Sequence, residues 1–568
     1  MDFGKINLDE HQDLARLIVK GAVTKNFRNR EAFERFRNNL VKENKGVIFH
    51  NLYFIKAYND LLDSGEIKAS PTFLKLIQKR SVRTMSGVTP VTVVTKPFPC
   101  PGKCIYCPTD VRMPKSYLPS QPAAQRAFRQ QFNPYTQVFV RLKALMLTGH
   151  EISKVELRIL GGTWSSYKKT YQTWFVKQCL LAMNEFHDQI DGGVADHMEK
   201  ITKTQKITSK YGVDEINTVI LKPLQKGSVS LAKVIETNET AKVRCIGINV
   251  ETRPDFINEK EVKRLRILGV TKAEIGVQTT NDEVQKMTKR GHGLKAVLKA
   301  TTLLKDAGFK IGYHMMPNLP GATVESDKKM IGELFAGDDY QPDYLKIYPC
   351  MVMPGTELAD LYAKGGFQPY DDKTLEEILY EEMKSVPEWC RVDRVTRDIP
   401  ANEIVAGSKK SNIRQTLVGT KLLPVKFREI RSREIYDGKI LLDDIQLVVR
   451  EYAASGGREL FISYEDVKKD KLIALLRLRF PGRTFIKELK NAALIREVHV
   501  YGAQVAVGGS GAGQKQHIGW GTKLMTDAEK FAKKSGYKKM AVIAGIGTRE
   551  YYRKKGYELE GTYMVKGI

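Results

Sequence analysis

Cysteine and long apolar runs are both scarce in this sequence of 568 residues. There are seven cysteines, an odd number, and four of them stand far apart inside apolar segments: Cys179, Cys245, Cys350 and Cys390. This pattern argues against a disulfide framework and predicts buried structural thiols. No stretch reaches the roughly 18 apolar residues of a membrane-spanning helix, and the acidic, helix-like start is unlike a signal peptide. We therefore expect a cytoplasmic protein without a membrane partner.

Acidic residues are also under-represented. The chain has 65 Asp and Glu against 92 Lys and Arg, which gives a formal net charge of +27 and a pI near 9.5. Such an excess attracts polyanions but says nothing about the fold. Nucleic acid is therefore the leading partner, and a generally basic, soluble surface is the alternative.

The patterning predicts an α/β multidomain protein, because single cores stop growing near roughly 250–300 residues. Residues 1–80 have the pattern of basic amphipathic helices and suggest a docking region. Across 81–390, short β-branched runs alternate with helical patterns, which favours βα units in a parallel sheet or partial barrel. Within this part, 187–240 is polar and weakly periodic, and we interpret it as a partly helical insertion of unassigned role.

The last third of the chain changes character. Segment 391–440 is rich in charge, with eleven Lys or Arg against five acids between 391 and 434, and suggests a basic linker. Segment 441–568 has closely spaced strands, then a helix, a strand, a helix and a hairpin-like end. We expect this segment to form a separate domain.

The remaining three cysteines, Cys100, Cys104 and Cys107, lie within eight positions in "CPGKCIYC". They follow a β-rich run, in a loop held by proline and glycine, and such a loop can wrap one metal centre. Thiolates suit zinc or an iron–sulfur cluster, and three of them leave one iron of a four-iron cube open. Zinc would need a fourth Cys or His, which is not nearby in sequence. Three unconnected core thiols are the remaining alternative.

This spacing is that of radical S-adenosylmethionine (SAM) enzymes, which the region resembles. The resemblance implies that Gly161, Gly162 and Thr163, at the end of the next strand, let the backbone approach the amino-acid end of SAM. It also favours Arg253 in "ETRPD" and Gln278 in "GVQT" as polar groups of the cofactor pocket, because strand ends converge in βα barrels. Each of these motifs could otherwise be an ordinary turn or capping segment.

The final domain resembles the GNAT acetyltransferase fold, which binds acetyl-CoA. Its motif "QHIGWGT" forms Q-x-x-G-x-G at a helix start, where exposed backbone N–H groups favour a pyrophosphate. The resemblance gives the strand Glu497, Val498, His499 and Val500 the role of holding the pantetheine arm by its backbone. The implied binding residues at the helix start are Gln516, Gly519, Trp520, Gly521 and Thr522.

A tyrosine near the sulfur of acetyl-CoA is a further feature of that fold. Tyr552 in "YYRKKGY" is the match that we favour, with Tyr551 behind it. The alternative is that both tyrosines are packing residues whose hydroxyls lie at the rim of the core.

Together, "ETRPD", "REVHVYG", "QHIGWGT" and "GTREYYRKKGY" resemble the Elongator catalytic subunit family, tRNA wobble-uridine modifying enzymes, from about Ser81 to the end. The resemblance implies a [4Fe-4S] cluster, SAM and acetyl-CoA, and the anticodon stem-loop of tRNA as partner. It also implies that Lys154 reaches acetyl-CoA from the radical SAM domain, where a plain surface lysine is the alternative. A homodimer and accessory subunits stay open.

The implied reaction joins the two domains. A radical generated from SAM would take hydrogen from the acetyl methyl group, the carbon radical would add to C5 of uridine, and water would open the thioester to give carboxymethyluridine. A different reading is a protein lysine acetyltransferase with the radical SAM domain as scaffold, which needs a base such as Glu497. A third is a tRNA-binding module without catalysis.

One segment departs from the family pattern. The linker often carries zinc-binding cysteines, but 427–435, "FREIRSREI", has none. We therefore predict no zinc there, and pairs of arginine and acid in its place if the segment is ordered.

Overall fold

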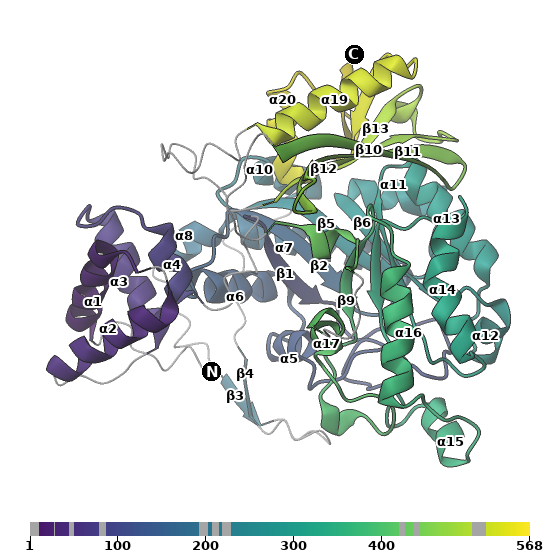
Figure 1. Ribbon diagram of the computed structural model, residues 1–568, viewed down its shortest axis with the longest axis horizontal. Helices are drawn as coiled ribbons and strands as arrows, with labels where there is room; N and C mark the ends of the chain where they lie inside the picture. Colours follow the sequence, from purple (N-terminus) through teal and green to yellow (C-terminus); the bar gives the residue numbers. More distant parts are fainter. Residues whose placement is uncertain are drawn as a thin grey trace.

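The computed structural model describes residues 11–27, 29–44, 50–78, 87–191, 203–206, 215–218, 229–419, 426–435, 444–501 and 519–568 (Figure 1). It contains two seven-stranded sheets, a two-stranded sheet and an amino-terminal group of helices. The prediction of an α/β multidomain protein is thus confirmed. No helix among these residues is both long enough and apolar enough to cross a membrane.

The first sheet is parallel throughout, in the order β1-β2-β5-β6-β7-β8-β9. Its middle strand β6 is buried at eight of nine positions, as expected for a strand covered on both faces. The order follows the sequence, with β1 and β9 at the two edges, so the sheet is an open partial barrel as predicted. The strands are β1 (Thr89–Val94), β2 (Lys154–Leu160), β5 (Arg244–Thr252), β6 (Val270–Gln278), β7 (Lys310–Met315), β8 (Tyr344–Ile347) and β9 (Arg391–Val395).

Helices connect these strands and cover the sheet. Several begin at a side-chain cap, as at Ser230, Asn258 and Asp371, whose oxygens accept a hydrogen bond from an N–H of the first turn. The helices are α5 (Pro122–Arg129), α6 (Pro134–Leu147), α7 (Lys169–Asn184), α8 (Phe186–Asp191), α10 (Leu231–Asn238), α11 (Glu259–Ile267), α12 (Asp282–Met287), α13 (Leu294–Asp306), α14 (Val324–Ala336), α15 (Glu357–Ala363), α16 (Asp372–Lys384) and α17 (Ile413–Gly419). The described part of the 187–240 insertion holds α10 and also a hairpin, β3 (Lys203–Lys206) with β4 (Glu215–Thr218), which its sequence does not predict.

Four helices at the amino terminus form a separate layer, purple in Figure 1. Phe33 packs edge-on against Phe54 and Phe73, with ring centroids 6.0 and 5.4 Å apart, in a small core of their own. Gln78 donates to the carbonyl of Gly149 and ties this layer to the first sheet's helices. The helices are α1 (Gln12–Lys25), α2 (Arg30–Glu43), α3 (Asn51–Asp63) and α4 (Pro71–Ile77).

The second sheet has the order β10-β11-β12-β13-β14-β16-β15 and is antiparallel except where β13 meets β14. Strand β13 pairs with β12 as far as Val500, but with β14 only from Ala493 to Ile495. The two strands therefore splay apart after Ile495. The elements are β10 (Ile445–Ala454), β11 (Gly457–Asp466), β12 (Lys471–Phe480), β13 (Ala493–Val500), α19 (Trp520–Lys534), β14 (Lys539–Val542), α20 (Arg549–Arg553), β15 (Glu558–Glu560) and β16 (Tyr563–Gly567).

The segment interpreted as a linker is more structured than its composition suggests. Arg391–Val395 is β9 and pairs with β8, so the boundary expected at 390 falls inside the sheet and is wrong. The reason is that Arg391 and Asp393 line a polar interior, which gives a buried strand the composition of a linker. Further on, the carboxylate of Glu429 is fully buried and pairs with Arg414, and this matches the expected arginine and acid pairs.

Buried ion pairs join the two sheets. Arg496 of β13 donates to Asp343, which precedes β8, at 2.5–3.0 Å, and to Glu459 of β11 at 2.6 Å. Arg479 of β12 donates to Asp306 at the end of α13 at 2.6 and 2.8 Å. All five side chains are at least 98% buried, so the sheets share a charged interior contact.

Candidate active site

The three clustered cysteines lie in the loop that follows β1, at the carboxyl end of the first sheet. Burial, and next the charge of Cys104, raise the pKa of the Cys107 thiol to about 11, so these sulfurs are close neighbours. The N–H of Gly102 donates to Cys100 Sγ at 3.4 Å. The other four thiols, Cys179, Cys245, Cys350 and Cys390, are buried as predicted.

The predicted glycine turn packs against this loop. Gly161 and Gly162, directly after β2, have φ values of 134° and 67°. A Cβ on Gly161 would lie 1.9 Å from Thr95 Oγ1, so only glycine fits there. Thr163 follows, with its Oγ1 3.5 Å from Cys100 Sγ. The turn thus leaves backbone, without side chains, beside the cysteine loop.

Arg253 and Gln278 also reach this end of the sheet. Arg253 is 5% exposed and donates Nε and Nη2 to Asp255, both at 2.9 Å, while its Nη1 has no hydrogen-bond partner among the described residues. A Cβ on Gly102 would lie 2.4 Å from that Nη1, which places the guanidinium against the cysteine loop. Gln278 ends β6 in a left-handed conformation with φ 75°, a strained geometry typical of functional sites.

The structure adds two residues that the sequence motifs do not single out, Arg290 and His292. Arg290 donates Nη1 to Cys104 Sγ at 3.4 Å and Nη2 to the carbonyl of Gly276 at 2.6 Å. Burial, and next the charge of Arg290, lower the pKa of His292 to about 4, and neither ring nitrogen has a partner in the described part of the chain. Both belong to "KRGHG" after α12, a glycine-flanked polar run that is the only sequence signal for them.

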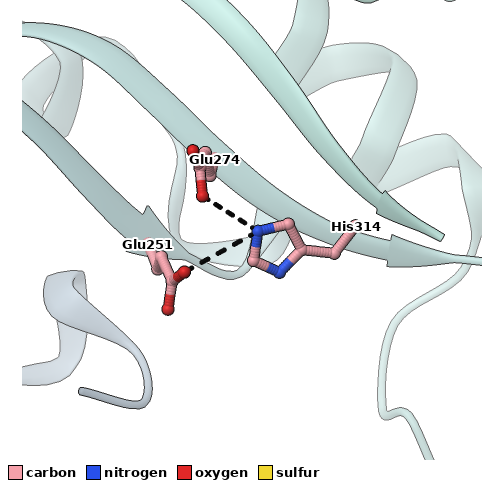
Figure 2. A group of neighbouring side chains, drawn as sticks. All are labelled: Glu251, Glu274 and His314. Carbon is pink, nitrogen blue, oxygen red and sulfur yellow. Dashed lines mark hydrogen bonds and ion pairs between the residues drawn. The ribbon is translucent and has the colours of Figure 1, made fainter. Parts of the chain in front are cut away.

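Polar side chains continue from this end into the interior of the sheet. Figure 2 shows Glu251 of β5, Glu274 of β6 and His314 of β7 pointing toward one another. His314 Nε2 lies 3.0 Å from Glu274 and 3.8 Å from Glu251. Lys346 of β8 pairs with both carboxylates, and Lys272 approaches Glu274 at 3.3 Å. Because the ammonium groups of Lys346 and Lys272 already pair with these carboxylates, the group is better described as an ion-pair network than as a metal site.

A second candidate site lies where β13 and β14 splay. Gly519 has φ 103° and caps α19, whose first backbone N–H groups are the natural place for an anion. A Cβ on Gly521 would lie 3.0 Å from the Tyr551 hydroxyl and 3.9 Å from Val500, so this glycine permits a close approach of three segments. Thr522 Oγ1 accepts a hydrogen bond from Lys555 at 2.8 Å.

Some predicted residues of this second site point elsewhere. The side chain of Trp520 is 6% exposed and packs on Tyr464 in the core, and Val498 and Val500 pack against the same core. The Trp520 side chain is therefore taken up by the core, whereas the partly buried Val498 also lines a cavity that adjoins this site. Gln516 lies outside the described residues.

A cavity of about 320 Å³ joins this second site to the first sheet. Tyr552 lines it, as do Glu497 and His499 of β13. Burial opposes ionisation of Glu497, but the charges of Lys310, Arg477 and their neighbours outweigh it and lower its pKa to about 2. The opposite wall is made by residues from the amino ends of the parallel strands: Pro90, Ile246, Thr271, Lys310, Tyr344 and Arg391.

Lys154 stands at the same amino end of the sheet. Lys154, Glu156 and Arg158 are every second residue of β2, so their side chains lie on the same face of the strand. Glu156 and Arg158 line the cavity. Burial, and next the charge of Arg244, lower the pKa of Lys154. Arg244 in turn packs on Gly547 just before α20, where a Cβ would lie 2.5 Å from Arg244 Cβ. Lys154 is thus placed near the second site and far along the strand from the cysteine loop.

Comparison with known proteins matches family models to the first half of this geometry and whole relatives to nearly all of the chain. Residues 99–334 match the Radical SAM superfamily, and residues 342–422 match the Radical SAM C-terminal domain. A "tRNA uridine(34) acetyltransferase" of Methanocaldococcus infernus is 40% identical over 526 residues, which cover 90% of this chain and 91% of that protein. "Elongator complex protein 3" of Dictyostelium discoideum is 36% identical and covers 93% of this chain and 92% of its own length. The chain belongs to the Elongator protein 3 and tRNA uridine(34) acetyltransferase family.

A solved structure of a family member is also similar. It is described as the archaeal Methanocaldococcus infernus Elp3 with an N-terminus deletion, and it superposes with a TM-score of 0.68 at 37% identity. The match covers 85% of this chain and all of that chain. A radical SAM domain implies a [4Fe-4S] cluster and SAM. The three cysteines fit this group, because Arg290 donates to Cys104 Sγ and the unpartnered Nη1 of Arg253 lies against the cysteine loop.

In this family member the two candidate sites lie at opposite ends of one sheet. The cysteine loop, the glycine turn, Arg253 and Gln278 come together at the carboxyl ends of the strands. Glu497, His499, Tyr552 and the α19 terminus gather at the amino ends. The network of Lys272, Glu274 and Lys346 lies between them, and Lys272 also lines the cavity. The interior of the sheet therefore lies between the two sites and connects them.

Proposed function

We propose that this protein is a tRNA uridine(34) acetyltransferase that uses radical SAM chemistry on acetyl-CoA to build a carboxymethyl group on C5 of the wobble base. The observation that carries the proposal is the shared interior: a radical SAM cysteine loop at one end of the parallel sheet and a splayed, GNAT-like strand pair at the other. A lone acetyltransferase would not need the first, and a lone radical enzyme would not need the second.

At the carboxyl end, Cys100, Cys104 and Cys107 would hold a [4Fe-4S] cluster with one open iron. When bound, the cluster and SAM supply a carbon radical able to remove hydrogen from a methyl group. The chain's own part is binding and orientation. The turn at Gly161 and Gly162 admits backbone close to the cofactor, and the unpartnered Nη1 of Arg253 offers a charged donor to a carboxylate or hydroxyl.

At the amino end, the splayed strand and the start of α19 would hold acetyl-CoA. The backbone of β13 after Ile495 has no β14 partner, so those N–H and C=O groups that face β14, and not β12, are available to the pantetheine amides. The pyrophosphate would lie at the N-terminus of α19, beside Gly519 and Gly521. Tyr552 and Lys154 would border the acetyl end from the two sides of the cavity.

Because the two sites lie apart, the bound acetyl-CoA would have to reach from one toward the other. Strand β5 has nine residues, so the sheet interior spans up to about 30 Å at 3.3 Å per residue. We propose that the acetyl-bearing arm extends from the cavity into this interior, past Lys272 and Glu274. The wobble base would enter through the open side between β1 and β9, because an anticodon loop presents unstacked bases. The basic helices α1 to α4 would contact the phosphates of the stem.

Lysine acetylation is the competing function, and one observation disfavours it. That reaction needs a base near the thioester, and Glu497 is the carboxylate expected in this role, although Glu156, Asp393 and Glu434 also line the cavity. Glu497 accepts hydrogen bonds from the Tyr344 hydroxyl at 2.6 Å and Arg477 at 2.9 Å, and its pKa is about 2. A carboxylate with so low a pKa is a poor base for a lysine ammonium. A tRNA-binding module without catalysis would leave both sites unexplained.

The deciding experiment supplies the chain with iron, sulfide, SAM, dithionite, unmodified tRNA and methyl-labelled acetyl-CoA under anaerobic conditions. Label in uridine 34 of tRNA supports the proposal. Label on protein lysine would support the competing acetyltransferase, and tight tRNA binding with no label in either polymer would leave only a binding module. Gly519→Ala, at a φ that alanine disfavours, should weaken acetyl-CoA binding while cluster absorbance stays the same.

A further inference from the structure

A row of four aromatic rings leads from the cysteine loop to the protein surface. Phe98, two residues before Cys100, stacks on Tyr167 with ring centroids 4.7 Å apart. Tyr167 stacks on Tyr171 at 5.2 Å, and Tyr171 contacts Trp174 at 5.6 Å. The row runs along the first half of α7 and ends at an indole ring that is 40% exposed.

The inner end of the row is fixed in place. The Tyr167 hydroxyl donates to the carbonyl of Lys96 at 2.9 Å and lies 2.7 Å from Thr95 Oγ1 and 3.2 Å from the carbonyl of Gly161. Thr163, in the same turn, touches Cys100 Sγ at 3.5 Å. The second ring is therefore hydrogen-bonded to both segments that frame the cysteines. These contacts fix a continuous path of packed atoms from the Cys100 sulfur, through the four rings, to the protein surface.

Positive charge lies close to the outer part of the row. Lys96, Lys168 and Lys169 are exposed, and Lys96 Nζ lies over the Tyr171 ring, 5.1 Å from its centroid. Arg264 donates to the carbonyl of Lys169 at 2.7 Å. Glu261 is the carboxylate that faces this group, and burial raises its pKa. Lys96 thus lies over the ring that contacts Trp174, and Arg264 also donates to Thr173, the residue before Trp174. An exposed indole close to these cations suits a partner surface that is acidic and has an apolar centre.

We propose that Trp174, Lys96, Lys168 and Lys169 form the docking surface for the electron donor of this protein, a small acidic one-electron carrier of the flavin or iron–sulfur class. The inference rests on the proposed function, in which the cluster must be reduced before each cleavage of SAM. The donor's reduced centre loses one electron and the cluster gains it, with no bond made or broken. The electron would tunnel from the donor to the cluster through the packed rings, because the tunnelling rate falls steeply with distance through unfilled space. The rings themselves are not oxidised or reduced in this step.

RNA would also be attracted by lysines beside an aromatic ring. The donor is favoured because the exposed ring is the end of a continuous stack that reaches the cysteine loop. A base-stacking platform needs only the outer ring and gains nothing from the three inner rings. RNA binding at this surface is therefore an outcome that the test must be able to detect.

The test measures bleaching of the cluster absorbance in a stopped-flow instrument, with reduced flavodoxin as the probe donor. Lys168→Glu with Lys169→Glu should slow reduction at least tenfold at low salt, because electrostatic steering changes association rates by 10 to 10³-fold. The matched control is Lys295→Glu with Lys299→Glu on the exposed face of α13, which makes the same charge change and should leave the rate unchanged. Trp174→Ala should also slow reduction, and Trp174→Phe should restore most of the rate.

Two further readouts separate the outcomes. Dithionite, which needs no docking surface, should reduce the cluster of every variant at the same rate, and unequal rates would show damage to the cluster instead. Loss of tRNA affinity in the Lys168 and Lys169 variant, with an unchanged flavodoxin rate, would overturn the proposal in favour of RNA. Equal flavodoxin rates in all variants would also overturn it. The labelled acetyl-CoA assay driven by dithionite stays valid in each case, so failure here leaves the proposed function standing.

Discussion

Arg290 is the residue with the most direct effect on the sulfurs. Its Nη1 donates to Cys104 Sγ at 3.4 Å, and the side chain is 8% exposed. Hydrogen bonds and positive charge at cluster sulfurs raise reduction potentials, because they stabilise the added electron. Arg290→Met should therefore still assemble a cluster, with a potential more negative by tens of millivolts, where about 59 mV corresponds to a tenfold change for one electron.

A potentiometric titration followed by electron paramagnetic resonance measures that shift. Arg264→Met is the control, since Arg264 lies on the outer helices and contacts Lys169 and Thr173. An unshifted potential in Arg290→Met would mean that the guanidinium only shapes the loop. Cys104→Ala gives the other limit, with no cluster absorbance and nearly unchanged tRNA affinity.

The buried carboxyl group of Glu382 lowers the free energy of unfolding at neutral and higher pH. It lies on α16, is fully buried, and neither carboxylate oxygen has a hydrogen-bond partner among the described residues. Burial raises its pKa well above the usual range, so the folded protein holds a proton that the unfolded chain has released. Stability is thus highest below the ordinary pKa of about 4.3 and falls as the pH rises toward the raised value.

Glu382→Met removes this cost and should stabilise the protein by about 1–3 kcal/mol at pH 8, with little gain at pH 4. Thermal unfolding of the full chain at the two pH values provides the measurement. Glu377→Met, an exposed position on the same helix, is the matched control and should change neither value. A gain that is equal at both pH values would contradict the assignment of a buried, protonated carboxyl.

At the scale of elements, the segment around α18 (Ile430–Arg433) shows how charge can order a linker. Glu429 accepts from the N–H groups of Val392 and Arg431 at 3.0 and 2.9 Å, and from Ser432 at 2.7 Å. Its ion pair with Arg414 completes the set. One buried carboxylate thus ties α17, β9 and α18 together.

Glu429→Gln keeps the shape but loses charge-assisted bonds, and should cost about 1–3 kcal/mol in local stability. Hydrogen exchange of residues 426–435 should accelerate, and added zinc should not slow it, because the segment has no cysteine. Glu451→Gln, on the exposed face of β10, is the control and should leave exchange unchanged. Zinc-dependent protection of this segment would refute the charged-linker account.

The same elements show where sequence patterns succeed and fail. Strands β5 to β8 are β-branched, apolar runs between helices, so the parallel sheet could be predicted from the alternation alone. Strand β9 has Arg391 and Asp393 at interior positions, so its composition resembles that of a linker. Its pairing depends on a polar interior and on the neighbouring strand β8, which no local pattern records.

The candidate site divides in a similar way. Cys100, Gly161 and Gly519 could be found because thiolate ligands, and close approach of the backbone to a ligand, would require those residue types at fixed spacing. Arg290 and His292 could not, since a single polar residue in a loop carries no pattern until the fold brings it to the cysteines. The sequence also gives no hint that the two sites lie at opposite ends of one sheet, because that depends on how the second sheet docks.

At the scale of the whole molecule, docking of the two sheets depends on ion pairs that are buried. Glu459 and the exposed Glu66 make a useful comparison, because the pKa of each is about 2. Burial opposes ionisation of Glu459, and the charges of Arg496 and Lys305 outweigh it. For Glu66, the hydrogen bond from Lys20 at the surface is the main cause. Equal pKa values thus have different physical origins.

Both carboxylates contribute stability above their ordinary pKa of about 4.3, and this is lost as the pH falls toward 2. Salt separates them, because exposed pairs are screened at a Debye length of about 3 Å in 1 M salt and buried pairs are not. We expect 1 M KCl to abolish the effect of Glu66→Gln on acid unfolding and to leave that of Glu459→Gln intact. Small-angle scattering between pH 5 and 2.5 should show the two sheets separating earlier in Glu459→Gln alone. Identical salt responses of the two variants would mean that the contact between the sheets is hydrated, and that its buried ion pairs do not hold the two sheets together.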